Sequence, residues 1–122
     1  MLTIEEKTQA VVAALEDIKA TDINVINTSK LSSMFERMVI ASGNSNRQTR
    51  ALADNVVVKL KELGEEVLGR EGEDSGDWVL IDLGEVIVHI MVPAVRAYYN
   101  LEELWNVKHL PGSAATKPKI AG

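Results

Sequence analysis

The chain has 122 residues, of which 46% are hydrophobic and 25% are charged, and its formal net charge is −5. These values describe a single globular domain that is long enough for one core, and the absence of cysteine excludes a disulfide framework. The negative charge disfavours broad nucleic-acid binding, and without an export signal or a bilayer-length apolar run we expect a cytoplasmic protein with no membrane partner.

The first part of the chain predicts a helix followed by two strands. Thr3 and Glu6 have the spacing of a capping box, and apolar residues at helical spacing follow them, so we expect a helix over residues 4–19. Short apolar runs then predict strands over residues 23–27 and 38–42, with a polar loop between them.

A second helix is predicted over residues 46–63, because Ser45 and Gln48 again have the spacing of a capping box. Its inward stripe is expected to be Leu52, Ala53, Val56, Leu60 and Leu63. After it we expect a short strand over residues 66–68 and, from the glycine- and acid-rich composition, a mobile loop over residues 69–76.

The remainder of the chain is organised around a predicted hairpin. Apolar runs over residues 78–81 and 86–92 flank a turn over residues 82–85, in which Gly84 can adopt a positive φ. Each run is too apolar for an edge strand with one wet face. The hairpin is therefore expected to lie in the centre of a sheet, with helices covering at least one face.

After the hairpin we expect a short helix over residues 93–99 and a last helical turn over residues 101–105, capped by Asn100. Strands that alternate with helices and then form a hairpin predict an α/β fold with a mixed sheet flanked by helices. We place this single domain over residues 1–105 and a flexible C-terminal tail over residues 106–122.

Few residues suggest chemistry. Residues 42–45 lead from a strand into a helix, but they lack the lysine and the glycine spacing of phosphate-binding loops, so a turn with an N-cap is favoured over an anion site. The acidic pair Glu71 and Glu73 falls in the glycine-rich loop rather than on a strand. We therefore expect no enzymatic activity, no metal and no cofactor. His89 is expected to be a hydrogen-bonded structural residue within the sheet.

Trp78 lies at the start of a predicted strand and within an acidic run. A tryptophan here suits either a core or an interface, and the sequence leaves both open. An aromatic anchor with a charged rim is typical of protein interfaces, and acidic residues favour a basic partner. We predict a partner surface made of Trp78, Asp77, Asp82, Gly84 and Glu85.

The motifs at residues 40–48, 53–56, 78–89 and 98–105 resemble the ribosomal silencing factor family, also called Iojap. The resemblance implies a nucleotidyltransferase-like fold without catalytic duty. It also implies a translation repressor that binds ribosomal protein number fourteen of the large subunit and blocks subunit association when nutrients are scarce. A catalytically active nucleotidyltransferase-like enzyme and a large-subunit assembly factor stay as alternatives, and a homodimer of the free protein stays open.

Overall fold

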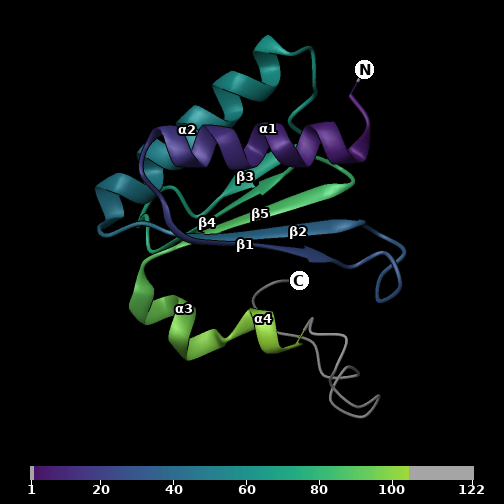
Figure 1. Ribbon diagram of the computed structural model, residues 1–122. Helices are drawn as coiled ribbons and strands as arrows, with labels where there is room; N and C mark the ends of the chain where they lie inside the picture. Colours follow the sequence, from purple (N-terminus) through teal and green to yellow (C-terminus); the bar gives the residue numbers. More distant parts are fainter. Residues whose placement is uncertain (1, 105–122) are drawn as a thin grey trace.

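The computed structural model describes residues 2–104, which form one mixed sheet with helices on both faces (Figure 1). In chain order the elements are α1 (Ile4–Asp17), β1 (Thr21–Asn27), β2 (Arg37–Ser42), α2 (Asn46–Glu62), β3 (Gly69–Glu71), β4 (Trp78–Asp82), β5 (Val86–Met91), α3 (Pro93–Tyr99) and α4 (Leu101–Leu104). The sheet has five strands in the order β1-β2-β5-β4-β3. Only β2 and β5 pair parallel. The predicted α/β domain with a mixed sheet is confirmed, whereas the likeness to nucleotidyltransferases stays a prediction.

The predicted hairpin is present and central. β4 and β5 pair antiparallel, and β5 lies between β4 and β2. In the connecting turn the amide of Leu83 donates to the carbonyl of Val86 at 3.0 Å, and Gly84 has a φ of 90°. A positive φ is open to glycine at little steric cost, so this residue lets the chain reverse within four residues.

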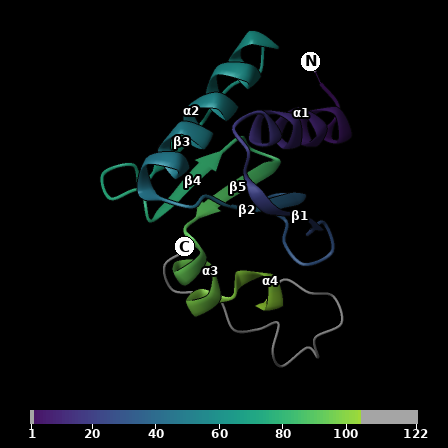
Figure 2. The same cartoon turned by 60° about the vertical axis from the view of Figure 1, so that its left-hand side comes forward.

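The larger core lies between the sheet and the pair α1 and α2. Figure 2 shows that these two helices lie on the same side of the sheet. The two helices contribute fully buried residues at helical spacing: Val11, Leu15, Leu52, Ala53, Val56 and Leu60. The predicted stripe of α2 is wrong at one position, since Leu63 is 51% exposed. The helix ends at Glu62, and Leu63 is its C-cap, so the chain turns away before that side chain reaches the core.

The capping predictions have different outcomes at the two helices. Thr3 forms the predicted capping box, with the Thr3 hydroxyl accepting from the amide of Glu6 and the Glu6 carboxylate accepting from that of Thr3. Ser45 also accepts from the amide of Gln48, at 3.1 Å. However, the side-chain amide of Gln48 donates from Nε2 to the carbonyl of Ile18 at 3.0 Å. This side chain therefore joins α2 to the end of α1 instead of completing the capping box.

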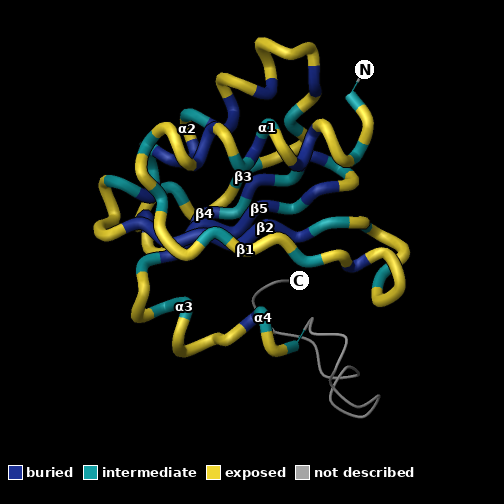
Figure 3. The backbone as a smooth tube through the Cα atoms, viewed as in Figure 1, coloured by how far each residue is buried: buried dark blue, intermediate teal, exposed yellow. Residues whose placement is uncertain are grey.

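A smaller core lies on the opposite face of the sheet, under α3 and α4. It contains the buried residues Met38, Ile40, Met91 and Leu101, with Trp78, Val95 and Leu104 packed against them. α3 begins at Pro93 as predicted, but no residue of this helix is buried. The backbone in Figure 3 shows the contrast between the dark, buried centre of the sheet and the largely exposed α3. The second face is therefore only partly covered.

An ion pair holds α3 and α4 beneath the sheet. Arg96 donates from Nε and Nη2 to the two carboxylate oxygens of Glu102, both at 2.9 Å, and from Nη1 to the hydroxyl of Ser42. Asn24 of β1 also donates to Glu102, at 2.7 Å. The hydrogen bond from Arg96 outweighs burial and lowers the pKa of the Glu102 carboxyl below its usual value. This network ties the last two helices to β1 and β2.

The region between α2 and the hairpin differs from prediction. The strand expected over residues 66–68 instead forms at β3, where it pairs with β4, and Leu68 is 58% exposed. Part of the expected mobile loop is therefore sheet. Residue 105 of the predicted last helical turn and the predicted tail over residues 106–122 lie outside the described residues. Within residues 2–104, no helix has the length and apolar character that crossing a bilayer requires.

Candidate functional site

The candidate site lies on the sheet face opposite α1 and α2, which we call the half-covered face. Side chains alternate along a strand, so Trp78, Leu80 and Asp82 of β4 share this face, while Val79 and Ile81 belong to the larger core. Leu80 is only half-buried. Apolar side chains of the central hairpin are thus accessible on this face, beside the edge of α3.

Among residues 2–104, Trp78 is the largest side chain on the half-covered face. It is half-buried and packs against the smaller core. Its indole Nε1 donates a hydrogen bond of 2.9 Å to Nδ1 of His89, and its ring lies 5.0 Å from the ring of Tyr99 at an angle of 47°. Part of the Trp78 side chain therefore belongs to the core and the rest stays accessible, and the interface role stays a prediction.

His89 is a buried, neutral hydrogen-bond acceptor. It is 1% exposed, and burial lowers the pKa of its imidazole to about 4. The predicted structural role within the sheet is confirmed. The hydrogen-bond partner of His89 was not predicted, although the register of the hairpin would have indicated Trp78. Because Leu80 lies opposite His89, Trp78 is a diagonal neighbour of His89 and lies within reach of a large side chain.

Two tyrosines of α3 extend this group of rings. Tyr98 is 80% exposed and Tyr99 is 37% exposed, and the two rings pack edge to face with their centroids 4.8 Å apart. We call Trp78, His89, Tyr98 and Tyr99 the aromatic cluster. The sequence places the two tyrosines in the family motif at residues 98–105 and predicts no contact for them. Both tyrosines lie on α3, which returns beneath the sheet (Figure 1).

The acidic residues predicted around Trp78 fall into two separate groups. Asp77 is exposed and precedes Trp78 at the start of β4. Asp82 ends this strand, about 13 Å from Trp78 at the usual rise of a strand, and Gly84 and Glu85 follow in the turn. The predicted partner surface therefore extends along the whole hairpin.

Two of these residues shape the hairpin turn. A carboxylate oxygen of Asp82 accepts a hydrogen bond of 2.8 Å from the amide of Gly84. Such a bond from a side chain to the amide two residues later stabilises a turn. Asp82 is half-buried, so its carboxylate is both a turn-forming group and part of the accessible surface. Gly84 supplies the positive φ and adds no side chain that could contact a partner.

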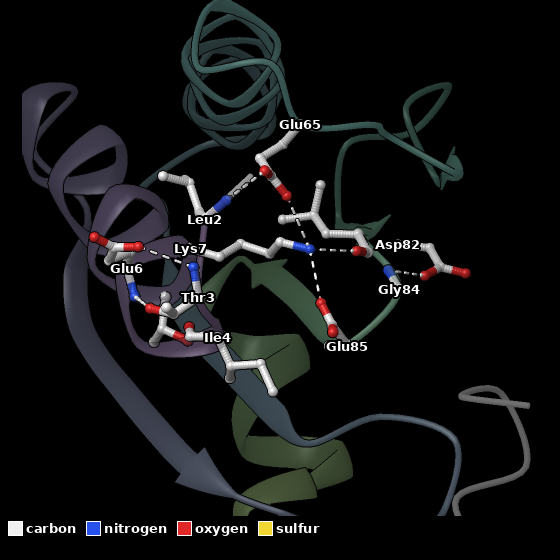
Figure 4. A network of polar contacts seen from close by, with 11 residues as sticks. Leu2, Thr3, Ile4, Glu6, Lys7, Glu65, Asp82, Gly84 and Glu85 are labelled. Atoms are coloured by element: carbon white, nitrogen blue, oxygen red, sulfur yellow. Dashed lines mark hydrogen bonds and ion pairs between the residues drawn. The ribbon is translucent and has the colours of Figure 1, made fainter.

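Glu85 belongs to a polar network around Lys7 of α1 (Figure 4). The Lys7 ammonium lies 2.9 Å from the carboxylate of Glu85, 3.1 Å from that of Glu65 and 3.3 Å from the carbonyl of Leu83. Burial disfavours the charge of Lys7, but its hydrogen bonds to Glu85 and Glu65 prevail and raise its pKa. The amide of Leu2 and the ammonium of Lys7 lower the pKa of Glu65. The network joins α1, the segment after α2 and the hairpin turn.

The segment before Trp78 is fixed by α2. Arg50 donates to the carbonyls of Glu73, Asp74 and Ser75 at 2.8 to 3.1 Å. Gly72 has a φ of 89°, and a Cβ there would lie 1.9 Å from the carbonyl oxygen of Trp78. The prediction of a mobile loop is therefore wrong, because the backbone carbonyls of this loop are bound to one helix. The backbone of Gly72 thus lies against the start of β4.

The turn between β2 and α2 has its amides in use. Gly43 donates to the carbonyl of Met91 at 3.1 Å, and Asn44 donates to the side chain of Gln48. The favoured interpretation, a turn with an N-cap, is confirmed. Among residues 2–104, no group of three or more histidine, aspartate or glutamate side chains is arranged to hold a metal ion. Of the acidic pair, Glu71 lies on β3, whereas Glu73 lies in the loop and forms an ion pair with Arg70.

Comparison with known proteins gives consistent matches. Residues 2–121 match the family described as "Ribosomal silencing factor during starvation". The ribosomal silencing factor RsfS of Chromobacterium violaceum is 55% identical over 104 residues, which cover 85% of each chain. A crystal structure of a protein from the same organism superposes with a TM-score of 0.86 at 52% identity, over 89% of this chain and 91% of the other.

A more distant relative is the mitochondrial assembly of ribosomal large subunit protein 1 of Mus musculus. It is 33% identical over 100 residues, which cover 80% of this chain and 44% of the mouse protein. The mouse protein therefore contains much sequence that has no counterpart here.

Proposed function

The chain belongs to the ribosomal silencing factor family, and from that membership we propose that it binds the large ribosomal subunit and prevents the small subunit from joining it. The observation that carries the proposal is the family match over residues 2–121. Such a protein represses translation without modifying the ribosome, and it acts in the cytoplasm. The half-covered face of the sheet is then the surface that contacts the large subunit.

We assign the contact with the ribosome to the aromatic cluster and the acidic residues along the hairpin. Trp78 has a large, partly exposed ring that is held by the smaller core and by His89. Residues of this kind are common interface hot spots. Asp77, Asp82 and Glu85 supply negative charge at both ends of β4. A net charge of −5 disfavours contact with bare ribosomal RNA. The partner is therefore a basic protein, for which we propose ribosomal protein number fourteen of the large subunit.

The proposed mechanism is occupancy. A protein that covers the joining face excludes the small subunit for as long as it is bound. Inhibition then follows the fraction of large subunits that carry the protein, is reversed by dilution, and needs neither ATP nor GTP. Subunits that have already joined resist it, because the small subunit hides the binding site.

Light scattering of purified ribosomal subunits tests this mechanism. Large and small subunits are mixed in magnesium-containing buffer with increasing amounts of protein. The expected result is a graded loss of joined ribosomes that saturates at one protein per large subunit and is reversed by dilution. Normal joining at saturating protein would refute steric exclusion. Irreversible inactivation by a substoichiometric amount would refute it as well, and would favour an enzyme.

A role in large-subunit assembly is the second candidate, and the name of the mouse relative favours it. Under this alternative, the protein sediments with incomplete large subunits in preference to mature ones. A sucrose gradient of a cell extract, probed for the protein, separates the two outcomes. The same light-scattering instrument, used on the free protein alone, tests for a homodimer.

A further inference from the structure

We propose that His89 is a positioning residue for partner binding, because its imidazole fixes the orientation of the Trp78 indole on the half-covered face. This inference rests on the function proposed above, in which Trp78 is the anchor. It adds a specific task for a residue that touches no partner itself.

The hydrogen bond between the two residues has a fixed direction. An indole N–H can only donate, so Nδ1 of His89 must hold a free lone pair to accept it. The two nitrogen atoms are 2.9 Å apart, which is an ordinary hydrogen-bond length. The accepting tautomer therefore carries its ring proton on Nε2, and the charged imidazolium could not make this bond.

His89 is also the rigid partner of the pair. It is 1% exposed and lies on β5, whose backbone is paired on one side with β4 and on the other with β2. Its neighbours across the two ladders are Leu80 and Ile40. A side chain in this position has little freedom to move, so its Nδ1 is a fixed reference point for the indole.

Trp78 lacks such confinement on its other side. The ring is half-buried, and its second aromatic neighbour, Tyr99, lies on α3, a helix without buried residues. Loss of the bond to His89 would leave only packing against the smaller core and Tyr99 to orient the indole. A partner would then have to order the ring on binding, which lowers affinity. The bond holds the ring in its binding orientation beforehand.

The experiment is a double-mutant cycle between the two positions. His89→Leu removes the acceptor and introduces an apolar side chain, while His89→Met leaves only the weakly accepting thioether sulfur and adapts to the space left by the ring. His89→Asn keeps an acceptor near the position of Nδ1. Each change is made in the wild-type chain and in Trp78→Phe, which keeps an aromatic anchor but has no N–H to bind. Circular dichroism first selects a temperature at which all the variants are folded.

Affinity for purified large subunits is then measured by titration. We expect His89→Leu and His89→Met to weaken binding by roughly three- to tenfold, which is the usual range for one lost hydrogen bond. His89→Asn should restore most of the affinity. In the Trp78→Phe background the same changes should have little effect. In NMR spectra, the indole N–H signal of Trp78, assigned through Trp78→Phe, should shift and exchange faster with water in the Leu and Met variants.

Two results would overturn the inference. The first is unchanged affinity of folded Leu and Met variants, and the second is an equal loss in both backgrounds, which would show that His89 acts through general stability. If the wild-type protein itself does not bind large subunits, the proposed function fails and the positioning role fails with it. That outcome is distinct from binding that ignores His89.

Discussion

At the scale of single residues, Trp78 has the most varied set of contacts on the hairpin. One edge of the indole is hydrogen-bonded to a buried histidine, one face meets a tyrosine ring, and the remainder is accessible. Large aromatic residues that are anchored in this way lose little freedom when they bind. This combination explains why a residue that packs on the core is also suited to a protein interface.

We predict that Trp78→Ala weakens binding to the large subunit by at least about 2 kcal/mol, the threshold of an interface hot spot. Co-sedimentation with purified large subunits, at a temperature where the variant is folded, measures the effect. Val58→Ala is the matched control, because Val58 is 50% exposed on α2, on the other side of the sheet. If folded Trp78→Ala co-sediments as well as the control, Trp78 is not the anchor.

His89 makes the stability of the fold depend on pH. Its pKa is lowered from 6.5 to about 4 by burial, so between these values the unfolded chain binds a proton that the folded chain does not. The free energy of unfolding should therefore fall as the pH falls through this range, by about 2 kcal/mol at a pH of about 5. Urea denaturation at a pH of about 7.5 and of about 5 measures the difference.

The control for this prediction is His89→Leu, which keeps His109 and every carboxylate. Glu65 and Glu102 have lowered pKa values, so the stability that they contribute is lost only below the ordinary carboxyl pKa of 4.5. The pH dependence above 5 should accordingly disappear in His89→Leu. Persistence of the full effect in this variant would assign it to other groups.

At the scale of elements, the network around Lys7 connects three parts of the fold. It joins the first turn of α1, the segment that follows α2 and the hairpin turn (Figure 4). The side chain of Lys7 is 8% exposed, and that of Glu65 is 6% exposed, whereas that of Glu85 is 53% exposed. Glu85 therefore differs from Asp77, which is also acidic and exposed but forms no ion pair with another residue of the range 2–104.

The two acids give a matched pair of charge reversals. Glu85→Lys places a second cation beside Lys7 and should lower the free energy of unfolding by about 1 kcal/mol. The effect is this small because solvent screens the half-exposed carboxylate of Glu85. Asp77→Lys should leave stability nearly unchanged. Both changes should slow association with a basic partner and reduce its dependence on salt. Urea denaturation and stopped-flow binding at two salt concentrations separate the two effects.

Equal stability of Glu85→Lys and Asp77→Lys would show that Glu65 alone neutralises Lys7. Unchanged association rates in both variants would show that the acidic residues of the hairpin do not face the partner.

At the scale of the whole molecule, the described residues of the two hydrophobic cores lie between Ala10 and Leu104. The larger one lies under α1 and α2, and the smaller one is closed by Leu101 and Leu104 of α4. Residues 106–122 contain two prolines and no apolar stripe, which underlies the prediction of a flexible tail. The domain should therefore fold without them.

We predict that truncation after Val107 leaves the midpoint of thermal unfolding nearly unchanged. Differential scanning calorimetry of the full and truncated chains tests this boundary. A fall of several degrees, equivalent to about 1 kcal/mol in a domain of this size, would show that the tail is docked on the fold. A truncation after Tyr99 is the contrasting control, since it removes Leu101 and Leu104 from the smaller core and should destabilise the domain.

The sequence by itself determined the local structure of this protein. Hydrophobic periodicity located both long helices and the hairpin, Thr3 and Ser45 marked helix starts, and Gly84 marked the turn. These features depend on residues a few positions apart, so their signals lie within short windows. The motifs along the hairpin also indicated the family, and the match over residues 2–121 confirmed it.

The tertiary structure alone decided which distant residues meet. Lys7 contacts Glu85, 78 positions later, and Asn24 contacts Glu102, also 78 positions later, because the strand order β1-β2-β5-β4-β3 places segments from the two halves of the chain beside each other. Likewise, β3 lies further along the chain than the strand expected over residues 66–68. Pairing with β4, and not the composition of the segment, selects the strand residues. Pairing, register and layering are set by contacts across the whole fold, so no local window of sequence contains them.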